Sequence, residues 1–425
     1  MVPHMTHAST HASTPAPSRR ATTAAAPFDC VSACPLYEST INQYFTDVAA
    51  ASATGVSGIA ATDNVYSVAT QYTDANNAPI QYNETFGGSY ADGNPFPTTG
   101  ACHDGVNKYC VTNKQLTAQI QKVITANHLP RFSTTTLYFI FTPARVGVCF
   151  SSGSPGKNNP CTTNAFCAYH DASVNGFVYA VEPDAQAIPG DVKNPHPCDP
   201  GQAPAGNSAD ATLNTISHEQ IESITDPFNT GWISGDTADN NPEIGDLCAY
   251  DFGTPLGGTP GTEYNQTING HSYYLQLEYS NAAANGAGGC VPYLGGPVTA
   301  ADPQNGVGPL VFGGGEVMTT NTVYAIYWVP AAPVSVKPPT ITGIPKAGKL
   351  LKSMPGSWQN SPTYTYRWLR CSSAGTSCKG ISLATHSSYS VAKADVGHKL
   401  ELRVTGTNMM GAVNATSAPT AIVAK

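Results

Sequence analysis

Twelve cysteines in 425 residues restrict the environments in which this chain can fold. An even number of closely spaced cysteines favours disulfide bonds formed in an oxidising compartment. A structural zinc site, the alternative, usually takes two CxxC pairs, and none of the spacings here is CxxC. We therefore expect a secreted, disulfide-bonded protein whose connectivity the spacing leaves open. The close pairs are Cys30/Cys34, Cys102/Cys110, Cys161/Cys167 and Cys371/Cys378, and Cys149, Cys198, Cys248 and Cys290 stand further apart.

The composition argues against nucleic acid as a partner and against a membrane-spanning segment. Charged residues make up only 11% of the chain, against roughly 25% in an average soluble domain. The net charge is −8, and no run of Lys or Arg is present that could neutralise a phosphate backbone, so nucleic acid is not an expected partner. No stretch of apolar residues is long enough to span a membrane.

Composition also divides the chain into four parts. Residues 1–27 form a His/Thr/Ala/Pro-rich tail with few residues that could be buried, so we expect it to be disordered. The tail also lacks the apolar segment of a secretory signal. Residues 28–330 hold the first folded domain. A Pro-rich linker follows at 331–337, and a second domain occupies 338–425.

Hydrophobic periodicity in residues 28–330 predicts an α+β fold. Apolar residues recur at helical spacing in three segments, and β-branched or apolar runs predict four strands. The predicted helices are 36–51, 112–129 and 210–226, and the predicted strands are 64–72, 134–142, 176–182 and 316–329.

The last part of the chain has the pattern of a β-sandwich. Short alternating runs at 364–369 and 399–404 are separated by frequent turn signals, and Trp368 is placed as a core residue. Cys371 and Cys378 would then close a hairpin of this domain.

The predicted helix at 210–226 contains His218-Glu219-Gln220-Ile221-Glu222. His218 and Glu222 are four residues apart and share a helix face, where an imidazole and a carboxylate can bind one metal ion. The pattern is HExxH with its second His replaced by Glu. In HExxH proteins the first Glu, here Glu219, activates a water molecule whose pKa the zinc ion lowers to about 7. A Glu ligand softens the preference for zinc over calcium or manganese. A solvated helix face is the alternative interpretation.

A third ligand has to come from beyond this helix. Asp226 would lie about 12 Å from His218 along a continuous helix, too far to share its ion. Glu243 and Asp246 follow in EIGDLC, and we favour Asp246. The alternative is that a wider acidic segment forms a turn or binds a structural calcium ion. That segment comprises Asp236, Asp239, Asn240 and Asp246.

His170 is a further candidate for the same site. It lies just before the predicted strand at 176–182. From this position it could approach the same cleft and act as a ligand or stabilise an oxyanion. The alternative is a structural hydrogen bond close to a disulfide.

Taken together, these segments resemble the phosphate-induced protein/EXORDIUM-like family, in particular its bacterial secreted members. The resemblance covers about residues 30–330 and rests on NVYSVATQY at 64–72, LYFIFTP at 137–143, CAYH at 167–170, SHEQIESITDP at 217–227 and EIGDLC at 243–248. It implies an extracellular domain with a zincin-like mixed sheet and an active-site-type helix. Plant relatives lack the HExxE, whereas the bacterial branch keeps it. The resemblance thus implies His218 and Glu222 as ligands, Glu219 as the base and Asp246 as a further ligand. It implies no reaction, because the family has no established activity.

One motif stands in an unexpected place. The family opens with a GGxVM…VYxIYW strand, whereas here this signature lies at 314–328. We expect a permuted strand at 316–329 that pairs beside 64–72, since domain termini often lie close together. The alternative is the start of a truncated second copy. The last 88 residues resemble immunoglobulin-like repeats of secreted actinobacterial proteins, which implies a module that positions the first domain without chemistry of its own.

Two functions are compatible with these features. The first is a secreted metal-dependent hydrolase of the peptidase type, in which Glu219 is the general base beside an ion held by His218, Glu222 and Asp246 or Glu243. Zinc is the expected ion, with calcium as the alternative or as an additional structural ion. The second is a non-catalytic protein of the cell envelope with a structural metal or none. In both cases we expect a monomer whose partner is an extracellular protein, a peptide or a cell-wall component.

Overall fold

The computed structural model describes residues 34–53, 63–97, 99–107, 109–131, 133–156, 158–188, 198–236, 242–360, 363–408 and 411–425. The predicted disordered tail lies outside these residues. The chain divides into two compact units, one made of residues up to 92 together with 96–328, the other of 93–95 together with 329–425. Helices and several sheets occur together, which confirms the predicted α+β class. Within the described residues, no helix has the length and apolar character needed to cross a membrane.

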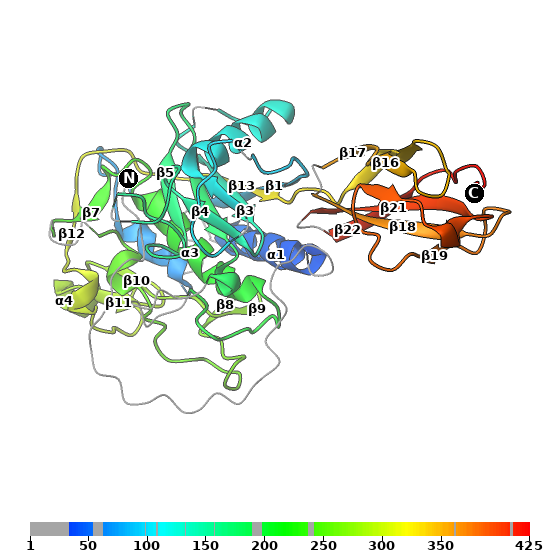
Figure 1. Ribbon diagram of the computed structural model, residues 1–425. Helices are drawn as coiled ribbons and strands as arrows, with labels where there is room; N and C mark the ends of the chain where they lie inside the picture. The colour runs from blue at the N-terminus through cyan, green and yellow to red at the C-terminus, as the bar shows by residue number, and fades with distance from the viewer. Residues whose placement is uncertain are drawn as a thin grey trace. The chain divides into compact units, whose positions relative to one another are not determined.

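A five-stranded sheet forms the centre of the first unit (Figure 1). Its order is β1 (Glu84–Asp92), β13 (Asn321–Trp328), β3 (Thr136–Thr142), β6 (Val178–Pro183) and β5 (Tyr169–Ala172). The first four strands are parallel, and the edge strand β5 runs antiparallel to β6. Every residue of β3 and β6 is buried, as expected for strands covered on both faces. The predicted strands at 134–142 and 176–182 are confirmed.

Strand β13 lies between β1 and β3, so the predicted strand at 316–329 is part of the sheet. Its expected neighbour is wrong, because residues 65–71 form a 3-10 helix, η1 (Val65–Gln71), rather than a strand. The Asn64 side chain accepts a hydrogen bond from the Tyr66 N–H, and the Ser67 hydroxyl donates to the Asn64 carbonyl. Such local bonds from side chain to backbone compete with a strand ladder.

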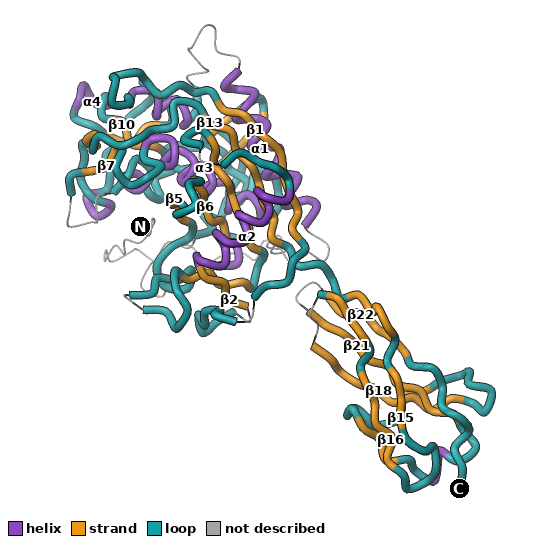
Figure 2. The backbone as a smooth tube through the Cα atoms, turned by 90° about the horizontal axis from the view of Figure 1, so that it is seen from above, coloured by secondary structure: helices purple, strands orange, loops and turns teal. Residues whose placement is uncertain are grey.

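Two helices cover one face of the sheet and a third covers the other (Figures 1 and 2). The helix α1 (Cys34–Ala53) packs on β1, where the rings of Phe45 and Phe86 are 5.5 Å apart, and reaches Phe139 of β3. The helix α3 (Ala209–Thr225) packs on β5 and β6. On the other face, α2 (Asn113–Ala126) begins with a capping box between Thr112 and Gln115. All three predicted helices are confirmed.

The short elements of the first unit pair locally. Strands β2 and β4 are parallel, whereas β7–β12, β8–β9 and β10–β11 are antiparallel pairs. These elements are β2 (Tyr109–Thr112), β4 (Val146–Cys149), η2 (Ala185–Ala187), β7 (Trp232–Ser234), η4 (Asp246–Cys248), β8 (Gln266–Ile268), β9 (His271–Tyr273), β10 (Glu278–Ser280), α4 (Ala283–Gly286), β11 (Gly289–Val291), η5 (Pro303–Asn305) and β12 (Leu310–Phe312).

Five disulfide bonds occur among the described residues, which confirms the predicted oxidised cysteines. Close spacing gives the partner in only two of them, Cys102–Cys110 and Cys371–Cys378. Cys161 and Cys167 are near in sequence but bond to different partners, as Cys149–Cys161 and Cys167–Cys198, and the fifth bond is Cys248–Cys290. The Cys30/Cys34 pair lies outside the residues whose side chains are described.

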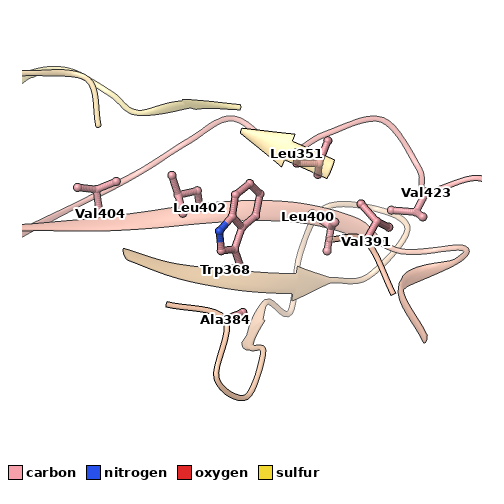
Figure 3. Packing of buried hydrophobic residues seen from close by; sticks show 8 residues of the cluster. All are labelled: Leu351, Trp368, Ala384, Val391, Leu400, Leu402, Val404 and Val423. Carbon is pink, nitrogen blue, oxygen red and sulfur yellow. The ribbon is translucent and has the colours of Figure 1, made fainter. Parts of the chain in front are cut away.

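The second unit consists of antiparallel strands around one apolar cluster. Trp368 is fully buried, as predicted, among side chains from β16, β18 and β21 (Figure 3). Its strands are β14 (Val334–Lys337), β15 (Thr340–Thr342), β16 (Leu350–Met354), β17 (Ser357–Gln359), β18 (Thr363–Cys371), β19 (Lys379–Gly380), β20 (Ser388–Ser390), β21 (Lys399–Asn408) and β22 (Gly411–Thr416), with the 3-10 helix η6 (Lys393–Asp395).

The predicted linker at 331–337 is partly wrong. Residues 334–337 form β14, which pairs antiparallel with β17. The sequence VSVK has the β-branched alternation of a strand, and the flanking prolines are compatible with an edge strand, which needs fewer backbone donors.

Candidate metal centre

The helix α3 is buried along its whole length. All 17 of its residues, including His218, Glu219 and Glu222, are buried beneath the sheet and the loops of the first unit. The interpretation of these residues as a solvated helix face is therefore wrong. At its start, the Asp210 carboxylate accepts hydrogen bonds from the backbone N–H groups of Ala205 and Asn207, which fixes the entry into the helix.

His218, Glu222 and Asp246 form a first group of potential ligands. The His218 Nε2 lies 3.0 Å from Glu222 Oε1 and 3.7 Å from Asp246 Oδ1. The backbone N–H of Asp246 donates to Glu222 Oε1 over 3.1 Å. The helix spacing and the returning loop thus bring one imidazole nitrogen and two carboxylates together.

The loop that carries Asp246 packs tightly against the helix. A Cβ atom on Gly245 would lie only 2.6 Å from His218 Nδ1 and 3.0 Å from Glu222 Oε1, so a side chain at this position would collide with both residues. The following turn, η4, is tied to β11 by the disulfide Cys248–Cys290. The Asp246 side chain is 14% exposed, whereas those of His218 and Glu222 are fully buried, so the group meets solvent on the Asp246 side.

His170, Glu219 and Glu222 form a second group beside the first. The His170 Nδ1 lies 3.3 Å from Glu219 Oε2 and 3.6 Å from Glu222 Oε2. His170 reaches α3 because it pairs with Ala180 across the antiparallel β5–β6 ladder, on the sheet face that carries Phe139 and the helix. Side chains alternate between faces along a strand, so its neighbours Tyr169 and Asp171 point the other way.

The other nitrogen of His170 has partners of its own. Its Nε2 lies 3.2 Å from the backbone carbonyl of Asp226 and 3.6 Å from Glu243 Oε1. A carbonyl oxygen only accepts, so Nε2 carries the proton of this bond. The Asp226 side chain accepts from the N–H groups of Thr230 and Gly231 at the end of the helix, which is a structural role.

All six residues predicted for the site therefore lie in one cluster: His170, His218, Glu219, Glu222, Glu243 and Asp246. Asp239 and Asn240, which belong to the alternative calcium segment, lie outside the described residues.

The electrostatics of the cluster are those of buried charges. Burial alone lowers the pKa of the His218 imidazole, but the Glu222 carboxylate, followed by Glu219 and Asp246, raises this pKa to about 10. The site thus stabilises positive charge where the His218 ring meets Glu222. Divalent cations and protons compete for such a position.

Two buried carboxyl groups around α3 were missed by the sequence interpretation. Glu182 ends β6 and accepts a hydrogen bond from the Thr215 hydroxyl over 2.7 Å, and Glu278 begins β10. Burial raises the pKa of each carboxyl group well above its usual range. The Glu219 carboxylate raises the pKa of Glu182 further, and the Glu222 carboxylate does the same for Glu278. Neither oxygen of Glu278 has a hydrogen-bond partner among the described residues. The sequence feature that could have revealed Glu182 and Glu278 is an acidic residue inside an apolar, strand-like run.

The donor set fits zinc better than calcium. The cluster offers two imidazole nitrogens together with carboxylate oxygens, and imidazole is a common ligand of zinc. Calcium takes six to eight oxygen ligands and does not favour nitrogen. The fully buried Glu219 retains one oxygen, Oε1, without a hydrogen-bond partner among the described residues, as expected where a solvent molecule or an ion completes the site.

Comparison of the sequence with protein-family models gives no matching family, and comparison with curated proteins gives no match.

Glu84, at the start of β1, is a third buried carboxyl group that the sequence interpretation missed. Its burial predicts that the stability of the protein depends on pH. Its Oε2 accepts a hydrogen bond from Gln220 on α3. Burial raises the pKa of Glu84 to about 8, against the lowering effect of hydrogen bonds from Asn321 and Gln220. The folded protein then holds a proton that the unfolded chain has already released, so stability falls as pH rises from the unfolded pKa towards about 8.

Glu84→Gln should remove this loss. We measure by calorimetry the difference in melting temperature between the variant and the unchanged protein. This difference should favour the variant more at pH 8.5 than at about pH 5, because the amide cannot ionise. Glu263→Gln, at a half-exposed position, is the matched control and should not change the pH profile. Parallel profiles for the Glu84 variant and the unchanged protein would contradict the prediction.

Proposed function

We propose that this chain is a secreted metal-dependent hydrolase of the peptidase type. The observation that carries the proposal is the convergence on one buried helix of a His/Glu pair at i,i+4 spacing, an intervening Glu, and a third carboxylate from a separate loop. Burying these charges without a partner is costly, so the arrangement favours a bound cation.

His218 Nε2, Glu222 Oε1 and Asp246 Oδ1 are the atoms that would hold the ion. A divalent cation in this position polarises a carbonyl group and lowers the pKa of water. Asp246 lies on the side that meets solvent. The tight packing of Gly245 against His218 and Glu222 keeps the two helix ligands in place.

Glu219 is the proposed general base. Its Oε1 is the buried oxygen that has no hydrogen-bond partner among the described residues, which leaves it available to accept a proton from water and pass it to the leaving amine. The other oxygen, Oε2, lies 3.3 Å from His170 Nδ1. His170 therefore acts on Glu219 as a positioning residue. Its Nε2–H is directed at the Asp226 carbonyl, so we assign it no role in stabilising an oxyanion.

The proposal includes the setting of this site. We propose that the first unit is a zincin-like domain related to the phosphate-induced protein/EXORDIUM-like family, that the second unit is an immunoglobulin-like module, and that the protein is secreted. The antiparallel edge strand beside α3 and the five disulfides support these assignments. Zinc is the proposed ion, and an extracellular protein, a peptide or a cell-wall component is the proposed partner.

A non-catalytic protein with a structural metal is the second candidate function. The observation that favours it is burial, because the side chains of His170, His218, Glu219 and Glu222 have no exposed surface. Structural zinc sites are closed, whereas catalytic sites keep an open position. Only the Asp246 side offers access in the first group.

A cleavage assay separates the two functions. We expect the full chain to cut an unfolded casein and a peptide library covering all pairs of residues, with new amino termini detected by mass spectrometry. A chelator should abolish cleavage by removing the ion, and one to two equivalents of zinc should restore it. Metal binding without cleavage would favour the structural function, and cleavage that resists the chelator would contradict both.

A further inference from the structure

We infer that Glu222 bridges two adjacent cation sites, so that the first unit binds a pair of divalent ions. The first site is the group of His218, Glu222 and Asp246, and this inference rests on the function proposed for it. The second site is made by His170 Nδ1, Glu219 Oε2 and Glu222 Oε2.

The two oxygens of Glu222 face different imidazoles. Oε1 lies 3.0 Å from His218 Nε2, and Oε2 lies 3.6 Å from His170 Nδ1. Within the described residues, these are the only two groups of potential ligands that combine histidine and carboxylate side chains, and Glu222 belongs to both. A carboxylate can bind one cation with each oxygen, and paired metal ions in hydrolytic enzymes lie about 3.5–4 Å apart.

His170 is oriented as a metal ligand is oriented. Its Nε2 donates to the Asp226 carbonyl and lies 3.6 Å from Glu243 Oε1, so its Nδ1 points at Glu219 and Glu222. Metal-binding histidines commonly donate their other ring N–H to a carbonyl or carboxylate, which fixes the tautomer and the ring. Glu243 is thus a positioning residue for the second site rather than a ligand of the first.

The charges of the cluster also favour two ions. Four carboxylates, those of Glu219, Glu222, Glu243 and Asp246, surround the two imidazoles, and the first three are almost fully buried. One divalent cation balances two of these charges and leaves two, whereas two cations balance all four with both imidazoles neutral.

The two oxygens of Glu219 fit an ion on Oε2 and a solvent molecule on Oε1. Glu219 is fully buried, one of its oxygens faces His170, and the other has no hydrogen-bond partner among the described residues. A fully buried carboxylate rarely leaves an oxygen unsatisfied unless water or an ion completes it. With Oε2 on the second ion, Oε1 still accepts the proton that general base catalysis requires.

Metal stoichiometry of single variants tests the bridge. The full chain is purified without an affinity metal, freed of metal, equilibrated with zinc, and its bound zinc is measured by elemental mass spectrometry. We expect two equivalents for the unchanged protein, one for His170→Ala, one for Asp246→Asn and none for Glu222→Ala, because only Glu222 serves both sites. His386→Ala, at an exposed histidine of the second unit, is the control and should keep two.

Each other pattern overturns the inference in a distinguishable way. One equivalent that is lost in Glu222→Ala and Asp246→Asn but kept in His170→Ala removes the second site and leaves the proposed function standing. One equivalent lost in all three variants means a single ion shared by both groups. No zinc in the unchanged protein removes the proposed function as well. If Glu222→Ala does not fold by circular dichroism, Glu222→Gln replaces it and should lose at least one equivalent.

Discussion

Glu219→Gln is expected to lower the rate of metal-dependent cleavage by about 10²–10⁴-fold, the usual contribution of a general base. The amide has nearly the same shape as the carboxylate but cannot accept the proton from water. None of the three atoms assigned to the proposed first site belongs to Glu219, so the variant should keep the zinc equivalent assigned to His218, Glu222 and Asp246. The second inferred ion loses its Glu219 ligand in this variant, so its equivalent should be weakened or lost.

Two measurements on this variant are needed together. Cleavage is followed at saturating zinc, and bound zinc is measured on the same sample, so that a lost base is separated from a lost ion. Glu316→Gln, at an exposed glutamate of the first unit, is the control and should retain full activity. A Glu219→Gln variant as active as the unchanged protein would rule out Glu219 as the base.

Trp368→Ala is expected to destabilise the second unit by about 3–5 kcal/mol, the usual cost of removing a buried tryptophan. The ring is fully buried in the apolar cluster, stacks on Tyr389 at 5.5 Å, and donates its Nε1–H to the His386 carbonyl over 2.9 Å. A domain of this size has about 5–15 kcal/mol of stability, so the loss is a large part of the total.

Calorimetry of the full chain is the measurement for this prediction. One unfolding transition should move to lower temperature in Trp368→Ala, while any bound zinc stays the same, because the residues of the proposed metal centre lie in the other unit. Trp358→Ala is the control, since its ring is only partly buried against the same cluster and should cost clearly less. Equal effects of the two substitutions would contradict the central position of Trp368.

Local pattern predicted the helix that carries the site. The apolar periodicity of 210–226 and the i,i+4 spacing of His218 and Glu222 are both properties of a single segment, and α3 follows them within one residue at each end. The strand predicted at 64–72 was wrong for a local reason. Its alternating pattern did not reveal that the side chains of Asn64 and Ser67 would bond to nearby backbone groups.

Features that depend on distant segments were not predictable in this way. His170 meets Glu219 only because β5 turns antiparallel beside β6, and Glu278 reaches the environment of His218 from β10, sixty residues along the chain. The disulfide partners of Cys161 and Cys167 are likewise set by the folded loops rather than by spacing. Sequence distance carries no information about such contacts, since they follow from the order of strands in the sheet.

Zinc content of the purified chain and of Glu222→Ala tests the central claim most directly. The protein is prepared without chelator or affinity nickel, dialysed, and analysed by elemental mass spectrometry. Glu222 is the residue common to both ligand groups, so we predict that the unchanged protein retains zinc and that a folded Glu222→Ala variant retains none. Absence of zinc from the unchanged protein, or equal zinc in the two proteins, would contradict a metal centre on α3.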